Sequence, residues 1–294
     1  MSQETVLRVE DLAYQQGRLW LIKGITFDLA PGFTAVIGPN GAGKSTLMRT
    51  IAGLLHAARG RLLLGTTRDT RLIARRIGYI PQFPGAYDNL SPLEFLVRTA
   101  WWDQSGGRHL FQRAEAVLER LGLLDVKQQP GRLLHPSERR RLALASVWMR
   151  RVRVVLLDEP TAELDPEQRL AFWQELYLLD SLPESPESYL ITTHLLSEVE
   201  SYCDAVLLLD RGRVRYDGSV RDFIATAHGH AFVAPGRFPE APHIDTGRFS
   251  DTGAWVLAAA PGEGFIPRTP DLTDAYLWAL NRHHLDNARE EANP

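Results

Sequence analysis

A glycine-rich segment near the start of the chain constrains the possible folds more than any other feature of the sequence. It fits the pattern G-x-x-x-x-G-K-[ST], with an apolar run at residues 33–37 before it and a segment of helical character at 45–55 after it. Between a buried strand and a helix, such a loop turns backbone N–H groups toward phosphate oxygens, and the helix N-terminus adds a positive dipole. The sequence therefore predicts an α/β fold with a phosphate-binding loop. The residues of the loop are Gly38, Pro39, Asn40, Gly41, Ala42, Gly43, Lys44, Ser45 and Thr46.

Two side chains of this loop have predicted chemical roles. We expect Lys44 to reach the β- and γ-phosphates of a nucleotide and Ser45 to ligate Mg²⁺ through its hydroxyl. The alternative is a strand-to-helix turn that is rich in glycine for purely structural reasons. That alternative is disfavoured, because the strand, the helix and the Lys-Ser pair all occupy the places that phosphate binding requires.

A second apolar run, at residues 154–157, ends in two acidic residues, Asp158 and Glu159. Acids at the carboxyl end of a parallel strand face the crevice where ligands bind in open α/β sheets. We expect Asp158 to hold Mg²⁺ through water, and Glu159 to orient and deprotonate the attacking water. A simple strand end is the alternative for this pair. His194 ends another apolar strand, although a lone histidine is more often structural than catalytic.

Composition limits the remaining possibilities. A length of 294 residues suits one large α/β domain, or a domain with a small appendage. The formal net charge of −3 gives no attraction to nucleic acid, and the single cysteine rules out an intrachain disulfide and fits a reducing cytoplasm. Residues 1–8 lack a signal-peptide pattern, and no apolar run approaches the ~20 residues that span a bilayer. We therefore expect a soluble protein whose membrane role would come through a partner.

The pattern along the chain predicts a sheet domain with a helical insert. Residues 91–94 form a capping box (Ser91, Glu94) with proline in the first turn, and helices are expected at 109–121 and 137–150. A helical subdomain over about 88–151 thus interrupts the sheet. Strands are expected at residues 6–9, 19–29, 33–37, 61–64, 77–80, 152–157, 189–193, 205–209 and 212–216.

The composition shifts toward Gly, Pro and His after about residue 227. Short strands are expected at 231–234 and 254–259, with a turn at 251–253 that joins two strands and a closing helix at 273–281. The predicted division is therefore a nucleotide-binding domain over 1–227 and a small C-terminal α+β accessory domain over 228–294.

These motifs, in this order, resemble the nucleotide-binding subunit of ABC transporters over about residues 5–226. Residues 38–46 match the Walker A loop, and 154–159 match Walker B with its catalytic glutamate. The resemblance implies the P-loop NTPase core of an ABC ATPase, hydrolysis of ATP, and ATP with Mg²⁺ as ligands. It assigns Lys44, Glu159 and His194 to catalysis, with His194 as the switch histidine that hydrogen-bonds the γ-phosphate.

The resemblance also implies roles for three other segments. Gln82, after Tyr79-Ile80-Pro81, matches the Q-loop glutamine, which touches Mg²⁺ or the attacking water and couples the site to the membrane subunit. Tyr14, in the polar stretch between the first two strands, lies where the family places an aromatic that stacks on adenine; an ordinary loop tyrosine is the alternative. Residues 162–165 resemble the D-loop. The implied metal ligands are Ser45, Gln82 and Asp158.

One motif departs from the family pattern. The family's signature is Leu-Ser-Gly-Gly-Gln, and the matching residues here are Leu134-His135-Pro136-Ser137-Glu138, followed by three arginines. In the family this segment reaches across a head-to-tail dimer and donates backbone N–H groups and a hydroxyl to the partner's γ-phosphate. Pro136 has no N–H to donate, and the side chains of His135 and Ser137 limit the approach of the backbone. We therefore expect a chain that holds ATP but is poorly equipped to complete its partner's site. The three arginines, at 139–141, are predicted to form a solvated helix face.

Two weaker similarities concern the subclass. Residues 87–96 and 269–277 resemble bacterial type-2 exporters, in which the ATPase and the permease are separate chains. This resemblance implies an integral membrane permease as partner, a location at the cytoplasmic face of the membrane, and a second ATPase subunit, with a homodimer slightly favoured over a heterodimer.

Three other classes of protein are alternatives to an ABC transporter subunit. A soluble ABC-type ATPase of translation or DNA repair is disfavoured, because there is one Walker A motif, one cysteine and a short helical insert. A GTPase is disfavoured, because the sequence contains no Asn-Lys-x-Asp motif. A regulatory ATP-binding module with weak turnover stays open because of the altered signature.

Overall fold

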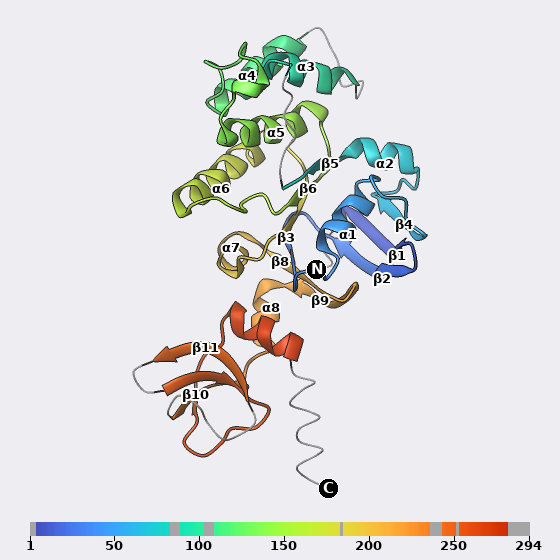
Figure 1. Ribbon diagram of the computed structural model, residues 1–294. Coiled ribbons are helices and arrows are strands. Elements are labelled where there is room, and N and C mark those ends of the chain that lie inside the picture. The colour runs from blue at the N-terminus through green and yellow to red at the C-terminus, as the bar shows by residue number, and fades with distance from the viewer. Residues whose placement is uncertain are drawn as a thin grey trace.

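A six-stranded sheet organises the chain, in the order β5-β6-β7-β3-β8-β9 (Figure 1). The computed structural model describes residues 4–82, 89–102, 109–182, 185–235, 243–250 and 253–281. All strands of the sheet are parallel except β9, so five carboxyl ends meet at one edge. The strands are β3 Gly32–Ile37, β5 Ile77–Ile80, β6 Val154–Asp158, β7 Ser188–Thr192, β8 Ala205–Asp210 and β9 Arg213–Ser219.

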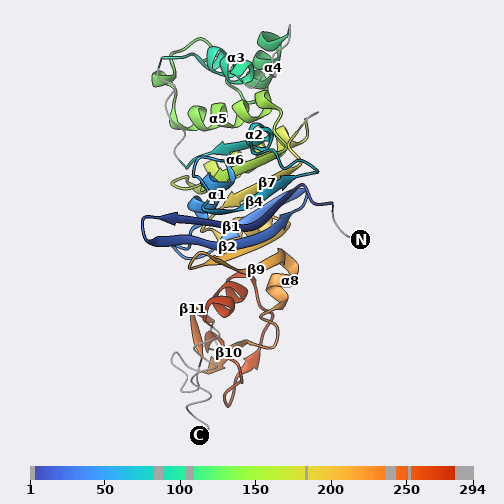
Figure 2. The same cartoon turned by 90° about the vertical axis from the view of Figure 1, so that its right-hand side faces the viewer.

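A smaller antiparallel sheet, in the order β2-β1-β4, lies beside the first (Figure 2). Its strands are β1 Leu7–Gln16, β2 Leu19–Leu29 and β4 Arg59–Leu64. Helix α1 (Lys44–Ile51) is buried between the two sheets, because Leu47 and Met48 share one apolar core with Val9 of β1 and Leu156 of β6. The strand predicted at 6–9 is too short, since β1 continues through Tyr14 to Gln16.

Helix α1 also ends earlier than the predicted residue 55. Gly53 has a φ of +75°, a left-handed conformation that glycine adopts at little cost and that stops the helix. The apolar residues Leu54 and Leu55 after it gave the misleading helical pattern.

The helical insert contains the predicted helices. Ser91 donates its backbone N–H to Glu94 Oε2 at 2.9 Å, which confirms the predicted capping box at the start of α3. Helices α4 and α5 confirm the helices predicted at 109–121 and 137–150, and pack with α6 on the sheet through one core that includes Leu157 and Ile191. Four helices outside the insert, α2, α6, α7 and α8, had no sequence prediction. The helices are α2 Thr70–Arg76, α3 Pro92–Trp102, α4 Leu110–Arg120, α5 Pro136–Arg150, α6 Pro166–Asp180, α7 Leu196–Tyr202 and α8 Val220–Ala225, with a 3-10 turn η1 at Gly131–Leu133.

The C-terminal part forms a third, four-stranded antiparallel sheet in the order β11-β12-β10-β13. Its strands are β10 Ala231–Pro235, β11 Ile244–Ser250, β12 Gly253–Leu257 and β13 Ile266–Pro267, and a helix follows at residues 272–281. The strand predicted at 231–234 and the closing helix are confirmed, and the strand predicted at 254–259 ends at 257. Residues 251–252 of the predicted turn lie outside the described residues, but Ser250 and Gly253 on either side pair with each other.

The C-terminal helix shares an apolar core with the six-stranded sheet. Leu272 and Trp278 pack in one cluster with Ile37 of β3 and Leu208 of β8. This cluster and the core around α5 and α6 cover the same face of β3, because Phe33 and Ile37 are an even number of residues apart. The division into 1–227 and 228–294 stays a prediction, and the shared core joins the two parts. Both views place the helical insert and the C-terminal sheet at opposite ends of the molecule (Figures 1 and 2).

Among the helices that the structure describes, none is both long enough and apolar enough to cross a bilayer.

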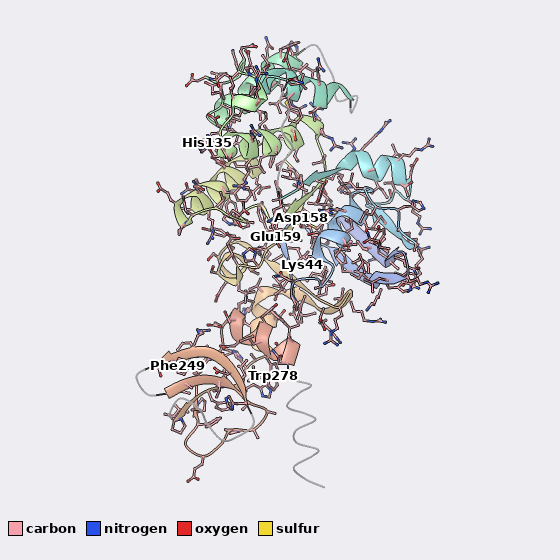
Figure 3. The ribbon with its side chains drawn as sticks, viewed as in Figure 1. Lys44, His135, Asp158, Glu159, Phe249 and Trp278 are labelled. Atoms are coloured by element: carbon pink, nitrogen blue, oxygen red, sulfur yellow. The ribbon has the colours of Figure 1, made fainter. Side chains whose placement is uncertain are left out.

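Two aromatic residues of the C-terminal part, both labelled in Figure 3, test the importance of this shared core. Trp278 is 7% exposed and Phe249 is 51% exposed. We expect Trp278→Ala to lower the free energy of unfolding by about 3–5 kcal/mol, because it leaves a cavity. Phe249→Ala, the matched control, is expected to change it by less than about 0.5 kcal/mol. Denaturant titrations measure both; equal losses would show that the core is not shared as described.

Candidate nucleotide-binding site

The carboxyl edge of the parallel strands collects most of the predicted site residues. Gly38 follows β3, Asp158 is the last residue of β6, and His194 comes two residues after the end of β7. Lys44, Asp158 and Glu159 lie together near the centre of the molecule (Figure 3). The sheet order explains this grouping, since ligands bind at the carboxyl edge of open α/β sheets.

The glycine-rich loop has a backbone that only glycine accommodates at its two ends. Gly38 has a φ of +148°, and a Cβ atom there would lie 2.1 Å from the carbonyl oxygen of Leu209. Gly43 has a φ of +105°, and a Cβ there would lie 3.0 Å from Ile22 Cδ1. The loop is thus pressed against β8 and β2, and Gly43 caps the N-terminus of α1. This arrangement leads the chain into α1 with the helix N-terminus at the loop, as anion binding requires.

Lys44 is held inside the loop. Its Nζ donates to the carbonyl oxygens of Gly38, at 2.8 Å, and of Pro39, at 3.2 Å, and the residue is 7% exposed. Burial lowers the pKa of Lys44, while the carboxylates of Glu159 and Asp158 act in the opposite direction. The side chain is therefore a confined donor with two carboxylates close enough to act on it.

Asp158 is the centre of a hydrogen-bond cluster. Its Oδ1 accepts from the hydroxyls of Ser45, at 2.9 Å, and Thr192, at 2.8 Å, while its Oδ2 accepts from the Tyr79 hydroxyl at 3.0 Å. Asp158 is only 3% exposed, so these hydroxyls replace the water that a buried carboxylate loses. Burial raises the pKa of Tyr79, which keeps the proton on its hydroxyl.

Glu159 adopts an uncommon backbone conformation beside this cluster. Its φ is +48°, in the left-handed region, and its N–H donates to Thr192 Oγ1 at 2.8 Å. Its Oε2 lies 3.6 Å from His194 Nδ1, and the His194 side chain is 54% exposed. Non-glycine residues in this region tend to occur at functional sites, where surrounding contacts hold them. The structure therefore brings Glu159 and His194 together at the open side of the edge.

Tyr14 lies on β1, and Gln82 follows the end of β5. Tyr14 pairs with Ile22 across β1 and β2, so both side chains are on one face, and Ile22 Cδ1 reaches the Cβ position of Gly43. Gln82 comes two residues after Ile80, the last residue of β5, whose partner in register on β6 is Leu157. The roles assigned to both residues stay predictions.

Three residues that position the site were not predicted from the sequence. Tyr79 and Thr192 both bind Asp158, and Glu198 of α7 accepts from Thr161 Oγ1 at 2.8 Å and Thr193 Oγ1 at 3.2 Å. Thr161 follows Glu159-Pro160 and Thr193 precedes His194, so Glu198 links the two loops that carry the acid and the histidine. A hydroxyl residue at the end of an apolar strand was the available signal for Thr192.

The residues at the edge fit a magnesium ion. Mg²⁺ binds oxygen ligands, usually one or two carboxylates with water and substrate phosphates. The Ser45 hydroxyl and the Asp158 carboxylate lie within hydrogen-bond distance of each other, beside the loop that holds Lys44. Ser45 and Asp158 would hold the ion, and the binding of Mg²⁺ to this chain stays a prediction.

The altered signature segment lies apart from this edge, at the start of α5. His135 is on the helical insert, away from Lys44 and Glu159 in Figure 3. Its backbone N–H donates to Glu138 Oε2 at 2.7 Å, and Pro136 is the first residue of α5. Two consecutive positions of the segment thus have no free backbone N–H.

The predicted solvated face of three arginines is wrong, because all three side chains are only partly exposed and burial lowers the pKa of Arg140. Arg139 donates to the carbonyl oxygens of Leu134, at 3.1 Å, and Arg132, at 3.0 Å. Arg141 donates to the carbonyl oxygen of Leu121 at 2.9 Å. These contacts fix α5 to the loops before it, so the two side chains are structural parts of the insert.

The fold and the site define a P-loop nucleotide-binding protein. The phosphate loop leaves β3, and the acidic pair leaves β6, with β7 between the two strands. The sequence model of the ABC transporter family matches residues 22–162, a range that includes both.

Individual relatives agree with this match. Nod factor export ATP-binding protein I of Ralstonia nicotianae is 33% identical over 74% of this chain and 68% of that protein. Daunorubicin resistance ATP-binding protein DrrA3 of Streptomyces coeruleorubidus is 30% identical over 77% of this chain and 72% of that protein. Across the first three relatives compared, the chain spans 62%, 74% and 68% of the relative's own length.

A solved structure agrees as well. The structure of CbiO1 from Clostridium perfringens, part of the ABC transporter complex CbiONQ, matches with a TM-score of 0.67 at 28% identity, over 76% of this chain and 92% of that chain. The chain belongs to the ABC transporter family, as an ATP-binding subunit. The predicted family and the P-loop fold class are thereby confirmed.

Thr192 offers a test of the geometry around Asp158 and Glu159. Thr192→Val keeps the shape of the side chain and removes the hydroxyl that binds both residues. Hydrogen bonds to charged groups contribute about 1.5–3 kcal/mol, so we expect ATP turnover to fall by roughly 10- to 100-fold. Thr34→Val, a buried threonine earlier on β3, is the control and is expected to keep the parent rate. Steady-state ATPase assays decide, and equal rates for the two variants would contradict this role of Thr192.

Proposed function

We propose that this chain binds Mg-ATP, hydrolyses it, and couples both steps to export through a separate membrane permease. The observation that carries the proposal is the cluster at the carboxyl edge, where Lys44, Asp158 and Glu159 meet. A phosphate-binding loop, a buried carboxylate and a second acid at one edge are the parts that phosphoryl transfer to water requires. Membership of the ABC family supports hydrolysis as the reaction.

The residues divide the work. Lys44, at the loop, neutralises phosphate charge, while Ser45 and Asp158 hold the metal ion. Bound Mg²⁺ would supply charge neutralisation on the phosphate oxygens. Glu159 lies next to the cluster with its backbone fixed by Thr192, so its carboxylate is placed to orient a water and take its proton. His194, 3.6 Å from Glu159, is placed to hydrogen-bond the γ-phosphate.

Two substitutions separate binding from hydrolysis. Lys44→Ala is expected to abolish tight Mg-ATP binding, because ground-state phosphate charge loses its counter-charge. Glu159→Gln is expected to keep binding and stop turnover, because an amide takes no proton from water. Fluorescence binding of an ATP analogue and a phosphate-release assay measure the two effects. Lys127→Ala, which removes a lysine paired with Glu115 on the helical insert, is the control for a lost positive charge. Near-parent turnover in Glu159→Gln would remove Glu159 from the role of base.

We further propose that the chain acts as a pair of ATPase subunits at the cytoplasmic face of the membrane, held there by the permease, with a homodimer slightly favoured. Names of relatives support export: one is a Nod factor export protein and another a daunorubicin resistance protein. The resemblance of residues 87–96 and 269–277 to type-2 exporters also supports export. Residues 87–88 lie outside the described residues. A subunit of the CbiONQ transporter complex has a similar fold, which supports a separate membrane partner.

The signature segment favours a second candidate, a regulatory ABC-type ATPase with weak turnover. In a head-to-tail dimer this segment faces the partner's γ-phosphate. The His135 N–H already donates to Glu138, and Pro136 has none, so the segment is short of donors for developing charge. A homodimer would have this deficit in both sites, and a heterodimer with an intact partner would have it in only one.

Repair of the segment tests this account. His135→Ser, Pro136→Gly and Ser137→Gly together restore a hydroxyl, a backbone donor and room for close approach. One donor to transition-state charge contributes about 100- to 1,000-fold in rate. In a preparation that contains only this ATPase chain, we expect the repaired variant to hydrolyse ATP faster by about that factor. Adding Glu159→Gln to the repaired chain should remove the gain. An unchanged rate after repair would refute this account of the segment.

A further inference from the structure

The third hydroxyl on Asp158 belongs to Tyr79, a residue to which the family resemblance assigns no role. Ser45 and Thr192 both donate to Oδ1, whereas Tyr79 donates to Oδ2 at 3.0 Å. A carboxylate that is held at both oxygens cannot rotate about its last side-chain bond without losing a hydrogen bond. Tyr79 therefore supplies the contact that fixes the orientation of the carboxylate.

The direction of the Tyr79 hydroxyl is set by Arg49 on α1. Arg49 Nε lies 3.4 Å from the Tyr79 oxygen and can only donate to it. Asp158 accepts, so the phenolic proton lies between Tyr79 and Asp158. Hydrogen bonds in such a chain polarise one another, so a guanidinium behind the phenol strengthens the bond that the phenol makes to the carboxylate.

The backbone of Tyr79 is fixed by the sheet. On β5 it pairs in register with Leu156 of β6, two residues before Asp158, and its ring packs in the core that contains α1. A Cβ at the preceding residue, Gly78, would lie 3.2 Å from both methyl groups of Val147. The strand is therefore packed on both sides, and the hydroxyl has little freedom to follow a carboxylate that moves.

We propose that Tyr79 is a positioning residue for the metal-binding carboxylate: its hydroxyl, directed by Arg49, holds Asp158 in the orientation that Mg²⁺ requires. This inference rests on the proposed function, because Asp158 is the proposed metal ligand. Without the hydroxyl, Asp158 keeps its charge and its contacts at Oδ1 but gains freedom at Oδ2. The cost then falls on the binding of Mg²⁺ with the nucleotide, and the contacts of Lys44 with phosphate are unaffected.

The experiment measures how much Mg²⁺ strengthens nucleotide binding. Affinity for a fluorescent ATP analogue is determined in excess Mg²⁺ and in EDTA, for the parent chain and for Tyr79→Phe. We expect Tyr79→Phe to reduce the strengthening by about 10-fold, as for a lost hydrogen bond to a charged group, and to leave the affinity in EDTA unchanged. Tyr189→Phe is the matched control, because Tyr189 is a buried tyrosine whose hydroxyl donates to a different carboxylate, Asp180, at 2.7 Å. This control is expected to lower the melting temperature and keep the full Mg²⁺ effect.

Arg49→Gln provides a second route to the same contact. Arg49 is exposed, so its substitution leaves the core intact even where Tyr79→Phe folds poorly. We expect a loss in the same direction but smaller, and no further loss when it is combined with Tyr79→Phe, because both act through one hydrogen bond. Additive losses would show that Arg49 acts separately and would overturn the proposed chain.

The outcomes separate this inference from the proposed function. A Tyr79→Phe variant with the parent's Mg²⁺ effect would overturn the role of Tyr79 and leave the proposed function standing. If Mg²⁺ does not change the nucleotide affinity of the parent chain, and Asp158→Asn has that same affinity, both the inference and the proposed function are refuted. A reduced Mg²⁺ effect in Tyr79→Phe, with Tyr189→Phe like the parent, supports the inference.

Discussion

The buried carboxylate of Asp158 holds the site together. It receives hydroxyl groups from helix α1, strand β5 and strand β7, which come from three distant parts of the chain. A buried carboxylate without such donors would be costly, so the donors and the acid require one another. The same contacts fix the backbone of Glu159, because the Thr192 hydroxyl donates to the carboxylate of Asp158 and accepts from the backbone N–H of Glu159. The position of the proposed base is therefore a consequence of how the proposed metal ligand is held.

Local patterns predicted the parts of the site that follow one another in the chain. The loop at 38–46 and the acidic pair at the end of β6 each follow a short apolar run, and such runs are visible in the sequence. Tyr79 and Thr192 could not be found in this way, because their role depends on which strands are neighbours. The order β5-β6-β7 places both residues beside Asp158, and that order is a property of the whole sheet.

Periodicity gave the wrong helix end where apolar residues follow the helix, as at Leu54 and Leu55 after α1, where Gly53 ends the helix. Helices α6 and α7 were not predicted, although Asp165 caps the first of them by accepting from the Gln168 N–H at 2.8 Å.

The C-terminal part shows a similar limit of composition. Its Gly, Pro and His content suggested an accessory unit, and the four-stranded sheet agrees with a separate small structure. Yet Trp278 and Leu272 lie in one core with Ile37 and Leu208, on the sheet whose edge carries the site. Ile37 is the residue directly before Gly38. Burial by the C-terminal helix therefore acts on the strand that positions the phosphate loop, and the contribution of this part to the site is expected to be through the rigidity of β3.

The start of α5 shows how local stability and function compete for the same backbone groups. The first N–H groups of a helix have no partner within the helix, and a capping residue satisfies them. Here Glu138 binds the His135 N–H, and Pro136 has no N–H to satisfy, which makes a stable beginning for α5. The family's glycines leave these groups free for the partner's nucleotide at some cost in helix stability, since glycine orders poorly. In this chain the residues that begin α5 also leave His135 and Pro136 without a free backbone N–H, so the capping of the helix and the proposed shortage of donors toward a partner depend on the same positions.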